Sequence, residues 1–152
     1  MGDSAGGNLL LALLSHISHP HPSTSLSIPR ISLTTPFRSA VLNSPWISFD
    51  LHTDSFKRNE YKDCITTEVG KKWSGAWLAC PWPHKLASDY YNQAITAPLE
   101  WWDGLMVKEV LVLAGEEEVL VDGIKDFAQR LSKLVPSPTS FTSHSSIFFR
   151  GI

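Results

Sequence analysis

GDSAGG, at residues 2–7, is the stretch of this sequence that decides the fold, and it runs directly into the apolar residues 9–14, LLLALL. Residues 9–17 predict an apolar helix that begins directly after the glycines. Glycines on either side of Ser4 lack the Cβ atoms that would clash in a sharp strand-to-helix turn. Such a turn lifts a serine hydroxyl clear of a sheet, so the pattern predicts a nucleophile at Ser4.

The same turn also predicts how a reacting oxygen would be stabilised. A helix that starts at Ser4 directs its N-terminal dipole and its unpaired N–H groups toward the reacting centre. The N–H of Ala5 is then in position to donate a hydrogen bond to an oxyanion. The alternative is a chance GxSxG in a flexible loop, but the apolar helix that follows argues against it.

The rest of the sequence predicts alternating strands and helices. A short strand is expected at residues 41–46, ended by a proline. Residues 107–114 (VKEVLVLA) form a nearly continuous apolar run, which is typical of a parallel strand covered on both faces. A helix over 120–134 follows, with Ile124, Phe127, Ala128 and Leu131 at helical spacing. We therefore expect an α/β fold, a mostly parallel sheet with flanking helices.

The middle of the chain, from about residue 50 to 102, is polar but rich in aromatic residues. Residues 68–78 can form a helix that places Trp73 and Trp77, four apart, on one face. These tryptophans, with Trp46, have two interpretations: they belong to a substrate pocket and cap, or they are plain core packing.

Composition excludes several classes of function. The formal net charge is −2 with no basic run, so nucleic acid is not an expected partner, and no apolar stretch is long enough to cross a membrane. The histidines at 16, 19 and 21 lack further ligands, so neither a metal nor another cofactor is expected. Cys64 and Cys80 are interpreted as free thiols, a disulfide being the alternative in a secreted protein, and the expected location is cytoplasmic.

Three segments together resemble one family. GDSAGGNL (2–9), LNSPWISF (42–49) and KEVLVLAGEEEVLVDGIKDFAQRL (108–131) are similar to the hormone-sensitive-lipase-like, or fold-3, carboxylesterases of the α/β-hydrolases. SFKRNEYKDC (55–64) and APLEWW (97–102) resemble fungal members of that group. The resemblance implies a serine hydrolase that forms an acyl-enzyme from short to medium acyl esters, with a small-molecule ester as its partner.

The resemblance also assigns an acid. The family has a pattern like Asp-Pro-Leu-x-Asp after the next-to-last strand, and residues 118–122 (EVLVD) match it, so Glu118 is the implied catalytic acid. Glu116 and Glu117 are alternatives displaced by one or two positions. Asp122 is interpreted as an early-helix residue favoured by the dipole. A further alternative is that these acidic residues only begin a helix and take no part in catalysis.

The resemblance leaves two parts of the machinery without a clear match. The family places its histidine after one more strand, whereas His144 precedes the final apolar run at 147–149; it is nevertheless the candidate base. No HGGG-type glycine loop is present. We therefore expect a fragment: residues 1–135 as the C-terminal part of a hydrolase domain, with a cap-like insertion at about 50–102, and 136–152 as a divergent tail. Activity is expected to be impaired, and a catalytically inactive binding protein is the alternative.

Overall fold

The computed structural model describes residues 1–22, 28–79, 89–134, 141–142 and 146–150. Its sheet has the strand order β1-β2-β3-β5-β4. β1 (Gly2–Asp3), β2 (Ala40–Asn43) and β3 (Glu109–Leu113) are parallel, which confirms the predicted parallel α/β sheet for these three strands. β5 (Ser146–Arg150) pairs antiparallel with β3, and β4 (Phe141–Thr142) pairs antiparallel with β5; neither pairing was predicted.

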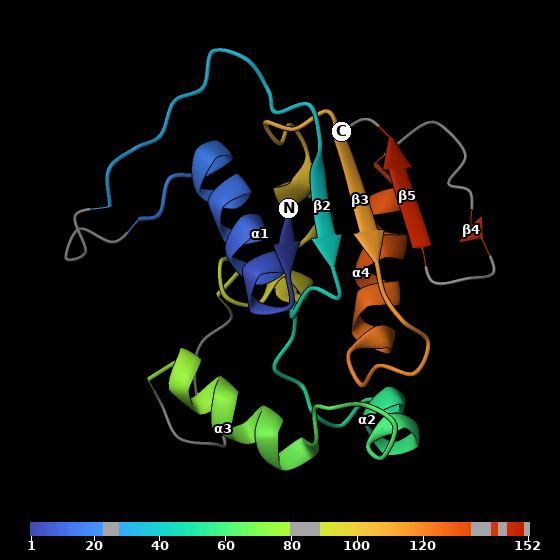
Figure 1. Cartoon of the computed structure of the whole chain (residues 1–152). Helices are drawn as coiled ribbons and strands as arrows, with labels where there is room; N and C mark the ends of the chain where they lie inside the picture. The colour runs from blue at the N-terminus through green and yellow to red at the C-terminus, as the bar shows by residue number, and fades with distance from the viewer. Residues whose placement is uncertain (23–27, 80–88, 135–140, 143–145, 151–152) are drawn as a thin grey trace.

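The parallel strands end at the same level. Asp3 pairs with Asn43, and Asn43 pairs with Leu113, so the residues that follow the three strands meet at one edge of the sheet. The carboxyl edge of a parallel sheet is where α/β proteins place their ligand sites. Figure 1 shows β2 and β3 pointing toward α2 (Asp54–Asn59) and α3 (Thr67–Trp77), which lie beyond this edge.

The predicted helices form where the sequence indicated. α1 (Ala5–Ser18) begins directly after Ser4, as the turn predicted and ahead of the apolar residues 9–17, and packs beside β1 and β2. α3 confirms the helix predicted at 68–78, and the Thr66 side chain caps it by accepting a hydrogen bond from the Val69 N–H. Side-chain oxygens at this position satisfy an N–H that has no partner inside the helix. α4 (Val121–Ser132) confirms the predicted helix after β3.

The core lies between the sheet and the helices. The predicted apolar face of α4 is buried there, together with Leu42 of β2 and Val112 of β3, each with 0% of its surface exposed. Two short 3-10 helices, η1 (Ala94–Thr96) and η2 (Leu99–Trp102), return the chain to the same core, where Trp102 packs edge-on against Phe127. Thus the aromatic middle of the chain supplies both the elements beyond the sheet edge and part of the core.

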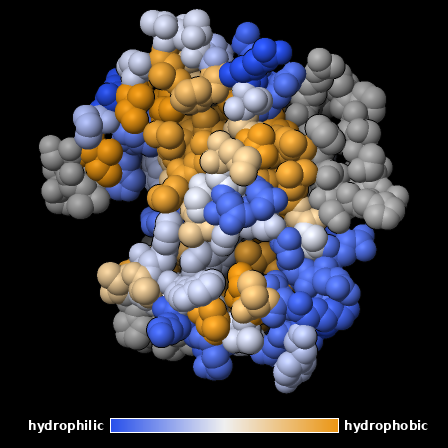
Figure 2. Space-filling view, in the orientation of Figure 1, coloured by the Kyte–Doolittle hydropathy of each residue, from blue (hydrophilic) through white to orange (hydrophobic). Residues whose placement is uncertain are grey.

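The surface retains a broad apolar area. Figure 2 shows hydrophobic residues gathered over the part of this face where Figure 1 has α1 and the parallel strands. Leu9 and Leu13 of α1 belong to the exposed large hydrophobic residues. None of the helices in the described ranges is long and apolar enough to cross a membrane.

Candidate active site

Ser4 lies on a strained turn between β1 and α1. Its backbone has φ 48° and ψ −116°, a left-handed conformation that non-glycine residues rarely adopt. The Ser4 N–H donates to the Asn43 carbonyl (3.0 Å) and its own carbonyl accepts from the N–H groups of Gly7, Asn8 and Trp46 (3.0, 3.2 and 3.0 Å). These bonds hold the turn in place, as expected for the position predicted to present a nucleophile.

The glycines around this turn do not all have the role that the sequence predicted. A Cβ on Gly2 would lie 2.2 Å from the Gly6 carbonyl oxygen, so glycine is required there. A Cβ on Gly6 would meet nothing within 4 Å, so the expected clash at this position is wrong. Glycine is required instead at position 7, because a Cβ on Gly7 would lie 2.7 Å from Cβ of Pro45. Gly7 therefore allows the loop after β2 to approach α1.

Ala5 is the first residue of α1 and lies beside Ser4 in the lining of a pocket. A helix has no internal acceptor for the N–H groups of its first turn. The Ala5 N–H therefore lies at the positive end of the α1 dipole, next to the Ser4 turn. Its role as an oxyanion donor stays a prediction.

Glu118 follows β3 and folds back toward the same sheet edge. Its Oε1 accepts hydrogen bonds from the Gly115 N–H (2.7 Å) and from Oγ of Ser44 (2.8 Å). Its Oε2 is buried and has no hydrogen-bond partner within the described part of the chain. A buried carboxylate oxygen costs free energy unless it is paired. Glu118 thus has one oxygen held by two hydrogen bonds and one buried oxygen without a partner among the described residues; its role as the catalytic acid stays a prediction.

The other acidic residues of this turn point elsewhere. Glu116 and Glu117 are exposed, and Glu117 pairs with Lys62 at 3.2 Å. Asp122 lies in the first turn of α4 as predicted, where it forms an ion pair with Arg58 and accepts from the Ser55 N–H (2.7 Å). The hydrogen bond from Arg58 lowers the pKa of Asp122 below its ordinary value. Of the acidic candidates, only Glu118 bonds to the residue that follows β2.

The α2 segment holds the acid turn from outside. Asn59, which is 1% exposed, donates from Nδ2 to the carbonyls of Glu116 (3.0 Å) and Glu118 (2.9 Å). Ser55 Oγ donates to the Val119 carbonyl (2.6 Å), and the Val119 N–H donates to Asp63 (2.7 Å). No local pattern predicts these contacts, because the two segments are more than fifty residues apart.

Ser44 is a further site residue that sequence reasoning missed. It follows β2, has φ 44°, and donates its N–H to the Leu113 carbonyl (2.7 Å) while its hydroxyl bonds to Glu118. Its position between a strand and Pro45 was the available signal in the sequence. Polar residues that directly follow parallel strands gather at the carboxyl edge of the sheet.

An open pocket of about 410 Å³ lies beside Ser4. Its lining consists of Ser4, Ala5, Trp46, Trp73, Ala76 and Trp77. Trp46 is 6% exposed and packs edge-on against Phe49, so it also belongs to the core. Trp73 is 49% exposed, so the alternative of plain core packing is wrong for it. The predicted tryptophan pair on α3 therefore faces the candidate nucleophile.

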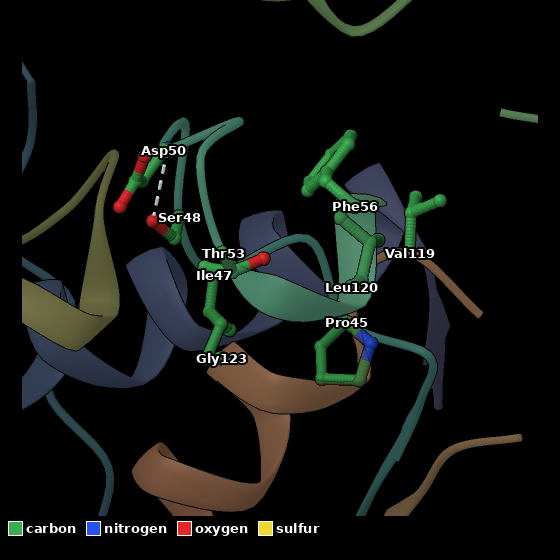
Figure 3. Close-up of a pocket in the computed structure, with 9 residues that line it drawn as sticks. All are labelled: Pro45, Ile47, Ser48, Asp50, Thr53, Phe56, Val119, Leu120 and Gly123. Carbon is green, nitrogen blue, oxygen red and sulfur yellow. Dashed lines mark hydrogen bonds between the residues drawn. The ribbon is translucent and has the colours of Figure 1, made fainter. Parts of the chain in front are cut away.

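A second crevice lies between the loop after β2, α2 and the start of α4. Figure 3 shows its lining, in which Pro45, Ile47, Phe56, Val119 and Leu120 supply apolar walls, and the Asp50 N–H bonds to Oγ of Ser48 at 3.1 Å. Its volume of about 10 Å³ holds about one water molecule. The crevice is too small for a substrate.

Among the described residues, His16 and His19 bond to groups other than Ser4 and Glu118. His144 and His84 lie outside the described residues, as does Cys80. His16 donates from Nε2 to the Pro29 carbonyl (3.0 Å) and accepts from the His21 N–H (3.0 Å), while His19 stacks on Trp101.

No group of three or more possible metal ligands occurs in the described ranges. Cys64 is a free, exposed thiol, and its pKa is raised by a hydrogen bond to Asp63.

Comparison with known proteins places this geometry in a family. The family model described as steryl acetyl hydrolase matches residues 1–150. Carboxyl esterase 2 from the mycorrhizal fungus Tuber melanosporum is 23% identical, with a TM-score of 0.62, over 88% of this chain and 38% of its own. A mutant of esterase rPPE is 23% identical with a TM-score of 0.64 over 88% and 36%, respectively.

The EstE5-PMSF structure is 27% identical with a TM-score of 0.59, over 85% of this chain and 36% of its own. The chain therefore spans less than two fifths of the length of these esterases. No curated protein matches the sequence significantly. These likenesses confirm the predicted α/β-hydrolase fold and its resemblance to carboxylesterases.

Proposed function

The chain belongs to the steryl acetyl hydrolase family, and we propose that it is a carboxylic ester hydrolase with Ser4 as its nucleophile. One observation supports this most directly: Ser4 stands on a left-handed turn at the start of α1 and lines the tryptophan pocket. A hydroxyl in this position is accessible to a ligand and close to the positive end of a helix dipole.

In the proposed reaction, Ser4 Oγ attacks the ester carbonyl carbon while His144 takes the hydroxyl proton. The tetrahedral oxyanion accepts a hydrogen bond from the Ala5 N–H. The C–O bond to the alcohol then breaks, the imidazolium returns the proton to the leaving alcohol, and water hydrolyses the acyl-serine in a second round. Glu118 accepts the imidazole N–H at Oε2 and stabilises the imidazolium; this oxygen is buried and has no partner among the described residues, which supports that role.

The proposed substrates are esters of short to medium acids, acetate above all, with a bulky apolar alcohol. Two observations support this class. The family description refers to steryl acetyl hydrolysis. In addition, the indoles of Trp46, Trp73 and Trp77 give the pocket broad apolar walls beside Ser4. Indole faces bind flat apolar groups without requiring polar partners in return.

We also propose that turnover by this chain is slow. In the family that the sequence resembles, the histidine follows the last strand, whereas His144 precedes β5. When the histidine accepts the proton poorly, the remaining rate enhancement comes from the oxyanion donor and from substrate binding. These two together accelerate such reactions about 10³–10⁴-fold over water.

The experiment is hydrolysis of p-nitrophenyl acetate by the purified chain, by Ser4→Ala and by Ser132→Ala, which removes a hydroxyl at the end of α4. We expect slow hydrolysis that falls to background in Ser4→Ala only. Equal rates for the chain and Ser4→Ala would contradict the assignment of the nucleophile and favour a binding protein. Turnover at an ordinary enzymatic rate of about 10 s⁻¹ would instead contradict the proposal that turnover by this chain is slow.

A further inference from the structure

Asn8 is a buried polar residue that the proposed reaction does not use. It lies one helical turn after Ser4, is 2% exposed, and donates its N–H to the Ser4 carbonyl at 3.2 Å. Its side-chain Nδ2 donates to two further carbonyls, those of Trp46 and Asn92, each at 2.7 Å. One amide group therefore connects the nucleophile turn to two segments that are 38 and 84 residues away.

Both of these segments lead to the tryptophan pocket. Trp46 is itself part of the pocket wall, and its N–H also donates to the Ser4 carbonyl. Asn92 accepts a hydrogen bond at Oδ1 from the indole Nε1 of Trp77, at 3.2 Å. The Trp46 and Trp77 rings meet edge-on, with centroids 6.2 Å apart. Asn8 thus holds the backbone at Trp46 and Asn92, and Asn92 in turn holds the Trp77 indole, so both pocket segments are connected to the helix that begins at Ser4.

A hydrogen bond fixes the Trp77 indole in a way that apolar packing would not. Apolar contacts are non-directional and allow side chains to shift, whereas a buried hydrogen bond has a defined length and angle and is costly to break. α3 lies beyond the sheet edge, and this bond connects the Trp77 ring to the segment that Asn8 holds beside the Ser4 turn.

We propose that Asn8 and Asn92 are positioning residues that set the width of the pocket beside Ser4, so that it prefers flat apolar groups over flexible chains of similar size. The inference rests on the proposed function in taking this pocket as the substrate site. It goes beyond that function in assigning selectivity to two asparagines, of which only Asn8 lies next to the nucleophile turn.

The test measures binding in a Ser4→Ala background, where the ester is not consumed, by calorimetric or NMR titration of the full chain. The probes are 2-naphthyl acetate, which is flat, and pentyl acetate, which is flexible. Asn92→Leu removes the acceptor for Trp77, Trp77→Phe removes the donor, and the double variant removes both. Trp101→Phe is the matched control, because it loses an indole hydrogen bond to Ser15 Oγ (3.0 Å) at the other end of α1.

We expect Asn92→Leu to reduce the ratio of naphthyl to pentyl affinity roughly fivefold, the effect of one hydrogen bond. The same substitution should change the ratio little once Trp77 is Phe, because the two residues act together. Trp101→Phe should leave the ratio unchanged.

An unchanged ratio in Asn92→Leu would overturn the proposal, and so would an equal effect of Asn92→Leu with and without the Trp77 indole. If neither probe binds the Ser4→Ala parent, the assignment of this pocket as the substrate site is overturned. Because no variant in this series can hydrolyse through Ser4, the outcome does not depend on whether the proposed reaction occurs.

Discussion

Ser44 Oγ donates a 2.8 Å hydrogen bond to Oε1 of Glu118, joining the residue after β2 to the turn after β3. The parallel register brings them together, since Asn43 pairs with Leu113 and Ser44 donates its N–H to the Leu113 carbonyl. Ser4 occupies the equivalent place after β1. The sheet edge therefore assembles the candidate nucleophile, the candidate acid and a hydroxyl that fixes the acid.

Replacing Ser44 with Ala should slow acylation of Ser4 by p-nitrophenyl acetate about tenfold. A hydrogen bond to a charged group contributes about 1.5–3 kcal/mol, and its loss would allow the Glu118 carboxylate to leave its position. Stopped-flow release of p-nitrophenol measures the rate. Ser48→Ala removes a hydroxyl from the neighbouring loop, where it only accepts from the Asp50 N–H, and should leave the rate unchanged. Equal effects of the two variants would show that Ser44 does not act through Glu118.

Gly115→Ala should reduce acylation and lower stability by no more than the hydrogen bonds that Oε1 of Glu118 accepts, about 1.5–3 kcal/mol each. The new Cβ would lie 2.9 Å from Oε1 of Glu118, the movable end of a side chain, so the carboxylate rather than the backbone has to shift. Thermal unfolding and the acylation rate, measured on the same sample, separate the two effects. A large loss of stability with a normal rate per folded molecule would contradict the position assigned to Glu118.

Two neighbouring glycines of the first turn of α1 should respond oppositely to alanine. Gly6→Ala meets open space and should stabilise the helix by about 0.5–1 kcal/mol. Gly7→Ala places a Cβ 2.9 Å from the Pro45 Cα, which cannot move away cheaply, and should destabilise the protein by about 1–3 kcal/mol. Urea unfolding measures both. Similar values for the two variants would contradict the close approach of the Pro45 loop.

The ion pair of Arg58 with Asp122 should make stability depend on acid pH. Arg58 lowers the folded-state pKa of Asp122 below 3.8, so the contribution is present above pH of about 4 and is lost as the pH falls through the folded-state pKa. Asp122→Asn should therefore be less stable than the parent at pH 7, and the difference should shrink toward pH 3. Urea titrations at pH 7, 5 and 3 measure it. A difference that is constant across this range would contradict the linkage.

The sequence predicts the parts of this site that depend on local pattern. The Ser4 turn, α1, β3 and the position of Glu118 follow from glycine placement, apolar periodicity and resemblance to the family. Ser44, Asn59 and Asn92 were not predicted, because their roles come from contacts between residues 15 to 84 positions apart, and no local period reflects such contacts.

The need for glycine at position 7 rather than at position 6 was not predicted for the same reason. It depends on where Pro45 lies in space, which the turn motif does not contain. The arrangement of the tail was also beyond prediction, because a short apolar run such as 147–149 does not specify whether its strand pairs parallel or antiparallel.

The central claim is that Ser4 is the nucleophile, and covalent labelling tests it most directly. Prolonged incubation with a fluorophosphonate, followed by peptide mass spectrometry, should show one adduct on the peptide that contains Ser4, formed slowly and absent in Ser4→Ala. Gly115→Ala should slow its formation, since Glu118 supports the base. A folded chain that forms no adduct at Ser4, or that is labelled equally after Ser4→Ala, would contradict the account.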